Sequence, residues 1–214
     1  MKAPLHACVH VAEFAAQVLL RVRPMEKGTA VAVLDGPAHD ERICALNRPA
    51  RQLGAVHELT RLDAESLREL HLLRRSEQVE EAARVVMLET ALQFTPRVEE
   101  VFAEGACALV LDMTGTERLF GAADTMAAQL RSAFAAVGML ATVAVSANFH
   151  VSRMLARARA GVTIVVAGDE AQALSRMPID ALDLDEAAYA TFALWGIHTL
   201  GELAALPEDE LITR

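Results

Sequence analysis

The sequence predicts a mixed α+β fold in which helices cover one face of a sheet, and three observations support this prediction. Short apolar runs of strand length alternate with longer stretches whose apolar residues recur at helical spacing. The elements run β-α and then, after a small α/β insertion, α-β-β-α-β-α-β. Of the 214 residues 53% are hydrophobic, which allows a substantial core and excludes a disordered chain.

The first third of the chain predicts a strand, a helix and the insertion. Residues 7–11 have the composition of a buried strand, and residues 12–21 place Phe14, Val18 and Leu19 on one helical face. The insertion spans about residues 24–77. Its expected elements are a strand over 29–34 closed by Asp35-Gly36-Pro37, a partner strand over 42–46, a short helix over 48–54 and a longer helix over 63–74.

The middle of the chain predicts the rest of the main sheet. Residues 76–94 give the widest apolar helical stripe, which Pro96 ends. Strands over 98–102 and 107–113 are expected to pair as a hairpin across Glu104-Gly105. The elements that follow are a helix over 122–137, a strand over 140–146, a helix over 149–160 and a short strand over 162–166.

From residue 167 onward the pattern changes to short helices separated by turns. They are expected over 170–175, 186–194, 199–206 and from 208. This region holds ten acidic residues against two arginines, so it carries −8 of the formal charge of −9. Because the chain stops one turn into a predicted helix, we expect it to be a piece of a longer protein.

Composition also limits the class of protein. No apolar run reaches the roughly 18 residues that a membrane span needs. The three cysteines, Cys8, Cys44 and Cys107, form no CxxC pair, which argues against a disulfide framework or zinc site and favours a reducing cytoplasm. Basic residues form no cluster, so any DNA contact of this segment is expected to be weak.

Five stretches resemble, in order, the motifs of the Y-family, lesion-bypass (UmuC/DinB-like) DNA polymerases. Residues 9–18 are similar to the strand that bears Asp-x-Asp, and residues 50–54 are similar to the fingers motif Tyr-x-x-Arg. The frame of the Asp-Glu pair is resembled by Val98-Glu99 with Leu111-Asp112-Met113-Thr114-Gly115. The Ser-x-Asn helix start is resembled by Ser146-Ala147-Asn148 with Arg153, and the thumb's helix-hairpin-helix by Gly196-Ile197 with Thr199 and Leu203. The resemblance implies a ferredoxin-like palm over 1–166 with inserted fingers at about 24–77, and a small all-α thumb over 167–214. The family's little-finger domain follows the thumb, so we expect it to lie outside this stretch of sequence.

The resemblance also implies where catalytic carboxylates belong, and this sequence lacks them. The family's metal-binding positions fall at His10, Ala12, Cys107 and Ala108, and the sugar-discriminating aromatic falls at Ala15. Polymerase chemistry needs two divalent ions held by carboxylate oxygens. We therefore expect no catalytic residue, no metal and no cofactor.

Two alternatives remain open at the sequence level. Displaced acids (Glu13, Glu104 or Asp112) could rebuild a magnesium site and give an active polymerase, although Asp112 fits a turn acceptor better. Arg51 and Arg153 occupy the family's phosphate-contacting positions. They could bind nucleotide or DNA phosphate, even as a nucleotide-sensing module, or serve as ordinary salt-bridge residues.

The thumb shows a similar loss. The family grips a DNA phosphate with a Pro-Gly-x-Gly turn, and the matching residues here are Leu182-Asp183-Leu184-Asp185. Aspartates repel phosphate, and Asp185 also reads as the N-cap of the next helix. A chain that keeps the polymerase scaffold but lacks the catalytic acids resembles the ImuB-type accessory subunit of bacterial SOS mutagenesis. By that resemblance the partners are a sliding clamp, a RecA-like protein and an error-prone polymerase, contacted through regions mostly absent here.

Overall fold

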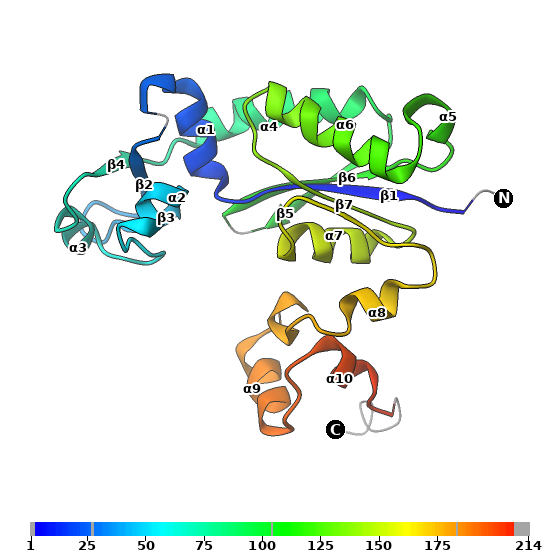
Figure 1. Cartoon of the computed structure of the whole chain (residues 1–214). Coiled ribbons are helices and arrows are strands. Elements are labelled where there is room, and N and C mark those ends of the chain that lie inside the picture. The colour runs from blue at the N-terminus through cyan, green and yellow to red at the C-terminus, as the bar shows by residue number, and fades with distance from the viewer. Residues whose placement is uncertain (1–2, 27, 104, 183, 208–214) are drawn as a thin grey trace.

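The computed structural model describes residues 3–26, 28–103, 105–182 and 184–207 (Figure 1). Its main sheet has five strands in the order β5-β6-β1-β7-β8, with β8 parallel to β7 and the other pairs antiparallel. The strands are β1 (His6–Val11), β5 (Val98–Ala103), β6 (Ala106–Asp112), β7 (Thr142–Ser146) and β8 (Val162–Ile164). The predicted strands of this sheet, including the 98–113 hairpin, are confirmed, while Glu104 lies outside the described residues.

Helices cover both faces of this sheet. The helices α4 (Glu77–Leu92) and α6 (Ala123–Ala136) pack on one face, and α7 (Phe149–Ala158) packs on the other (Figure 1). The mixed α+β class is confirmed, but the expectation of helices on one face is incomplete. The reason is that β1 and β6 present apolar side chains to both sides, and the second set needs α7 as its cover.

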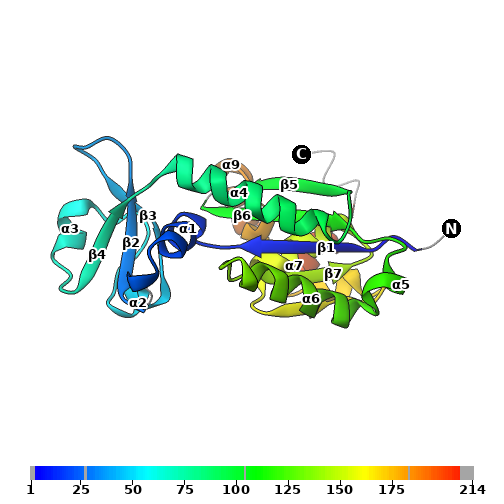
Figure 2. The same ribbon diagram turned by 90° about the horizontal axis from the view of Figure 1, so that it is seen from above.

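A second, three-stranded sheet with order β3-β2-β4 lies beyond one end of β1 (Figure 2). Its strands are β2 (Ala30–Asp35), β3 (Arg42–Leu46) and β4 (Leu70–Arg74), with the short helices α2 (Arg48–Gln52) and α3 (Arg61–Glu65) beside them. The helix α1 (Phe14–Val22) lies between the two sheets, with Phe14 and Val18 in the core of the larger sheet and Ala15, Ala16 and Leu19 against the smaller one.

The helix expected over residues 63–74 is wrong. Only its start is helical, in α3, and its end is the strand β4, which pairs parallel with β2. Glu69 has a left-handed backbone (φ 71°), which ends any helix just before β4. Leu70 and Leu72 then pack into the core of the smaller sheet, so tertiary pairing outweighs the helix preference of this stretch.

The remaining elements follow the predicted order, with one added helix and two 3₁₀ turns. They are α5 (Glu117–Phe120), which the sequence did not predict, α8 (Glu170–Leu174), the 3₁₀ turns Pro24–Glu26 and Ile179–Leu182, α9 (Glu186–Leu194) and α10 (Leu200–Ala204). Thr199 and Glu202 form a capping box at the start of α10. The helix expected from residue 208 lies outside the described residues. Across the described residues, every helix is too short or too polar to cross a bilayer.

Candidate functional site

His10 and Ala108 face each other on the two central strands. The antiparallel register of β1 and β6 sets His10 opposite Ala108 and Val11 opposite Cys107. Ala108 belongs to the core under α7, and His10 shares that face because it is two residues beyond Cys8, a member of the same core. His10 is 7% exposed. Burial, with a smaller contribution from the charge of Arg157, lowers its pKa to about 4, so the imidazole is neutral at pH 7.

The other two positions expected at this centre lie elsewhere. Cys107 points to the opposite face of β6, into the core shared with α4 and α6. Burial raises the pKa of its thiol to about 12, so Cys107 is protonated at neutral pH and is a poor nucleophile. Ala12 follows the end of β1 and is exposed. The structure therefore brings together His10 and Ala108, with Cys107 on the other face.

The donor atoms of this pair do not fit a pair of divalent ions. Magnesium takes oxygen ligands, and two-metal sites hold their ions roughly 3.5–4 Å apart between carboxylates. His10 offers a buried nitrogen and Ala108 offers no ligand atom. Within the described ranges no group of three or more His, Cys, Asp or Glu side chains is placed to hold a metal ion.

Glu13, the acid nearest to this centre in sequence, turns away from it. Its backbone is left-handed (φ 52°, ψ 43°) at the start of α1. Its carboxylate accepts a hydrogen bond of 2.7 Å from the Leu46 backbone N–H, and it lies 2.8 Å from Nε2 of His57. The same carboxylate forms an ion pair with the guanidinium of Arg51. Glu13 is thus a partner of the smaller sheet.

Asp112, the third acid considered, lies at the far end of β6. It is four residues from Ala108, about 13 Å along a strand. Its carboxylate accepts the Thr114 backbone N–H at 2.9 Å and lies 3.2 Å from Nε of Arg97. Burial raises the pKa of Asp112, but the hydrogen bonds from Thr114 and the charge of Arg97 outweigh burial and lower it. The prediction of a turn acceptor is confirmed.

Arg51 and Arg153 are held apart by the fold. Arg51 lies on α2 beside the smaller sheet, with its side chain 57% exposed and paired with Glu13. Arg153 lies on α7, under the larger sheet, where its charge acts on the buried Cys8 thiol. The two arginines therefore belong to different elements on different parts of the molecule. Neither is among the described side chains that line the cavity between the sheets.

That cavity has a volume of about 700 Å³ and is bounded by α1, α4, α7, the starts of β3 and β6 and the end of β2. Ala15, which the resemblance matches to the sugar-discriminating aromatic, lines it. Its charged lining consists of the arginines 42, 75, 84 and 157 and the acids Asp35, Asp40, Glu58 and Glu80. Because these formal charges cancel, the cavity has no net positive lining to attract a triphosphate.

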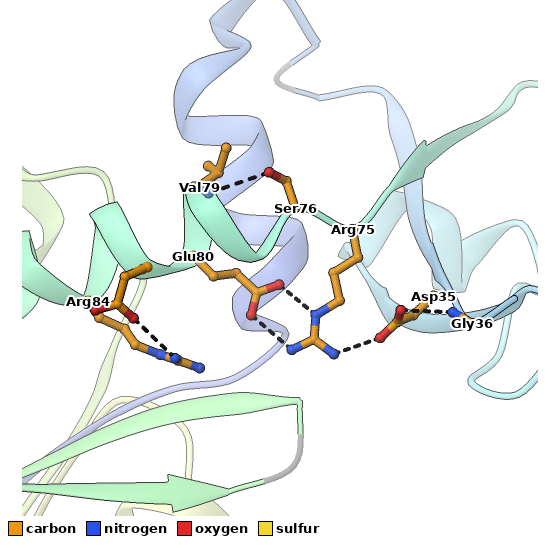
Figure 3. A network of polar contacts seen from close by, with 8 residues as sticks. Asp35, Gly36, Arg75, Ser76, Val79, Glu80 and Arg84 are labelled. Atoms are coloured by element: carbon orange, nitrogen blue, oxygen red, sulfur yellow. Dashed lines mark hydrogen bonds and ion pairs between the residues drawn. The ribbon is translucent and has the colours of Figure 1, made fainter.

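Arg75 spans the junction between the two sheets along the wall of this cavity (Figure 3). Its guanidinium donates two hydrogen bonds to Glu80 on α4, at 2.7 and 3.0 Å, and one of 2.7 Å to Asp35 at the end of β2. The hydrogen bond from Arg75 is the main cause that lowers the pKa of Asp35. The side chain of Glu80 is only 4% exposed. Because its buried carboxylate is held by charge-assisted hydrogen bonds, the network fixes how the smaller sheet meets α4.

Comparison with known proteins places this architecture. The sequence model of the impB/mucB/samB family matches residues 9–157, which is more than half of the chain. The chain belongs to the impB/mucB/samB family. The match contains the end of β1 from Val9, the smaller sheet, the hairpin of β5 and β6, and α7 up to Arg157. It therefore includes the positions expected at the catalytic centre, which are His10, Ala12, Cys107 and Ala108, and both Arg51 and Arg153.

Two curated relatives show how far the similarity extends. Protein ImuB of Caulobacter vibrioides (strain NA1000 / CB15N) is 32% identical over 133 residues, which is 62% of this chain and 28% of ImuB. DNA polymerase IV of Desulfatibacillum aliphaticivorans is 26% identical over 204 residues, 92% of this chain and 50% of that protein. The chain therefore spans half or less of the length of these relatives.

Solved structures share the fold. The insertion ternary complex of Dbh DNA polymerase superposes with a TM-score of 0.80 at 18% identity, covering 97% of this chain and 62% of that one. DinB from Sulfolobus solfataricus gives a TM-score of 0.76 at 18% identity, with the same coverage. The likeness confirms the mixed α+β fold of Y-family polymerases. By the expected correspondence, the five-stranded sheet is called the palm and the three-stranded sheet the fingers.

The residues expected to match the thumb's phosphate-gripping turn end at the start of α9. Asp185 is the N-cap of that helix, and its carboxylate accepts the Ala188 N–H at 2.7 Å, as predicted. Asp183 lies outside the described residues. The capping carboxylate places a negative charge at this helix start and occupies the Ala188 N–H, so both effects disfavour a phosphate there.

Sequence reasoning missed the arginines that line the cavity. Eighteen of the twenty basic residues are arginine, so residue type did not mark Arg75, Arg84 or Arg157. Arg157 had a usable signal, because it lies four residues after Arg153 and so on the same face of α7. Arg75 had none, since its partners Asp35 and Glu80 belong to different elements that only the fold brings together.

Proposed function

We propose that this chain is a non-catalytic, polymerase-like accessory protein of SOS-induced, error-prone translesion DNA synthesis. The observation that carries the proposal is the His10–Ala108 pair. It stands on the central palm strands where a polymerase holds carboxylates, and it consists of a buried neutral imidazole and a methyl group. Removing the carboxylates removes the charge neutralisation on which phosphoryl transfer depends.

The remaining acids support the same reading. Glu13 is engaged by the fingers through Leu46, His57 and Arg51, and Asp112 is engaged by Thr114 and Arg97. Moving either acid to the His10–Ala108 pair would break these contacts. Of the displaced acids considered for a relocated metal site, the two that the structure describes are therefore both engaged elsewhere.

The proposal includes weak DNA contact and protein partners. Dbh is recorded in ternary complexes, one of which is described with its substrates, and ImuB is a relative of this chain. We extend DNA binding to this chain, at low affinity because the C-terminal helices are acidic and the cavity lining is neutral. Partners of the expected kind are a sliding clamp, a RecA-like protein and an error-prone polymerase. We place the palm at 1–166, the inserted fingers at about 24–77 and the thumb at 167–214.

Primer extension by the 214-residue chain tests the proposal. Purified protein with a primer-template, deoxynucleotides and magnesium or manganese is expected to incorporate nothing above background, while an active Y-family polymerase in parallel extends the primer. Template-dependent incorporation that disappears in Glu13→Gln/Asp112→Asn would contradict the accessory role and establish the alternative, an active lesion-bypass polymerase. The similarity to DNA polymerase IV over 92% of the chain is the observation that keeps this alternative in view.

A further inference from the structure

Three hydrogen-bond donors of the fingers converge on one carboxylate of the palm. The Leu46 backbone N–H reaches Oε2 of Glu13 at 2.7 Å, and Nε2 of His57 lies 2.8 Å from Oε1. The guanidinium of Arg51 pairs with the same Oε1. These donors come from the end of β3, from α2 and from the loop after α2, so they surround one point without belonging to one helix end.

The three donors form an oxyanion-binding arrangement. A backbone N–H, a guanidinium and an imidazole nitrogen are the groups that proteins aim at carboxylate or phosphate oxygens. Here the anion is supplied by the chain itself. Glu13 is 16% exposed in its side chain, whereas Arg51 and His57 are 57% and 48% exposed, so the carboxylate is the inner, enclosed member of the group.

The backbone at Glu13 adopts an unfavourable conformation where its side chain makes this contact. Glu13 has φ 52° and ψ 43°, a left-handed conformation that costs a non-glycine residue of order 1 kcal/mol. It occupies the N-cap position of α1 without capping the helix by a side-chain hydrogen bond. The side chain instead reaches across to the fingers.

We propose that Leu46 N–H, Arg51 and His57 form an oxyanion site that Glu13 keeps filled, so that the chain excludes external phosphate groups from it. The ligand class of the vacated site is a small phosphate oxyanion, such as pyrophosphate or the phosphates of a nucleotide. A tethered carboxylate is present at high effective concentration, so a free anion competes with it poorly. The proposal is independent of the accessory role, because it concerns anion binding and not nucleotide incorporation, and either test can fail without the other.

Calorimetric titration with pyrophosphate tests the site. Glu13→Gln keeps the shape of the side chain but removes its charge, and Glu58→Gln is the matched control because Glu58 is also a left-handed glutamate, next to His57. We expect saturable pyrophosphate binding at least tenfold tighter in Glu13→Gln than in the unaltered chain and in Glu58→Gln. The gain should disappear in Glu13→Gln/Arg51→Ala. Equal affinity in the unaltered chain and Glu13→Gln, or no binding by a folded Glu13→Gln, overturns the proposal.

A second measurement keeps the proposal testable if Glu13→Gln does not fold. In the unaltered chain, ¹⁵N NMR of the arginine side chains should show hindered rotation of the Arg51 guanidinium and no shift of its signals with millimolar pyrophosphate. A freely rotating Arg51, or signals that shift saturably with pyrophosphate, contradicts a filled site. A parallel titration with a deoxynucleoside triphosphate on Glu13→Gln distinguishes a nucleotide from a simple phosphate ligand, since tighter binding than pyrophosphate requires contacts to the base or sugar.

Discussion

Arg75 and Glu80 share two hydrogen bonds across the junction between fingers and palm (Figure 3). Arg75 follows β4 of the fingers, and Glu80 lies in the first turns of α4 in the palm. The third hydrogen bond of Arg75, to Asp35, returns to the end of β2. One guanidinium thus sets the position of one subdomain against the other, and it does so with a glutamate whose side chain is 4% exposed.

Glu80→Gln is expected to destabilise the chain by about 2 kcal/mol. This is less than the roughly 3–5 kcal/mol for breaking a fully buried pair, because Arg75 is 35% exposed and keeps Asp35. Urea unfolding followed by circular dichroism measures the change. Glu81→Gln is the matched control on the same helix, where the glutamate is 69% exposed and the expected cost is below about 0.5 kcal/mol. If the two substitutions lower the free energy of unfolding equally, the Arg75–Glu80 network has no special structural role.

The stability of the chain is expected to fall as pH drops from 6.5 towards 4, because of His10. Its folded pKa of about 4 is below the ordinary value of 6.5, so in this window the unfolded chain binds a proton that the folded chain does not. The contribution of His10 to the loss between pH 7 and pH 4.5 is about 2 kcal/mol. Urea unfolding at a series of pH values measures it.

His10→Gln should flatten this pH dependence, whereas substitution of the exposed His150 by glutamine should not change it. If His10→Gln and the unaltered chain lose stability in parallel between pH 7 and pH 4.5, the assignment of a buried, neutral imidazole to His10 is wrong.

Asp112→Asn is expected to destabilise the chain by about 1 kcal/mol at pH 7, through the weakened hydrogen bond from Thr114 and the lost charge beside Arg97. The folded pKa of Asp112 is below its ordinary value of 3.8, so its carboxylate stabilises the fold above that pH and stops doing so as pH falls through the folded pKa. The difference between the two proteins should therefore shrink in acid. A difference that is the same at pH 7 and pH 2.5 would show that charge plays no part.

Gly201→Ala is expected to loosen the packing of α10 on α8. A β-carbon at this position would lie 2.7 Å from the backbone oxygen of Ser175, which accepts the Gly201 N–H at 3.0 Å. Relief of this overlap costs about 1–3 kcal/mol and must shift backbone. Hydrogen exchange should speed up in residues 197–206 and not in the palm. Ala204→Ser, at an exposed position of α10, is the control and should leave exchange nearly unchanged.

Much of the fold followed from local sequence. Short continuous apolar runs specified β1, β6 and β7, and Ser76 as N-cap with Pro96 beyond the end specified α4. These signals succeed because caps, breakers and amphipathic period act within a few residues. They failed at residues 70–74, where a leucine-rich stretch with helical preference became β4 because β2 offered it a parallel partner.

The sequence by itself determined which chemical groups the palm lacks: no arrangement of the fold can give His10 or Ala108 a carboxylate. Tertiary structure alone decided what the remaining acids do. Glu13 is next to Ala12 in sequence, yet a left-handed backbone carries its carboxylate to Leu46, Arg51 and His57, residues 33 to 44 positions away. This pairing depends on how the two sheets meet around α1. No local sequence pattern encodes that arrangement, because the packing of the apolar faces decides which distant charged residues come together.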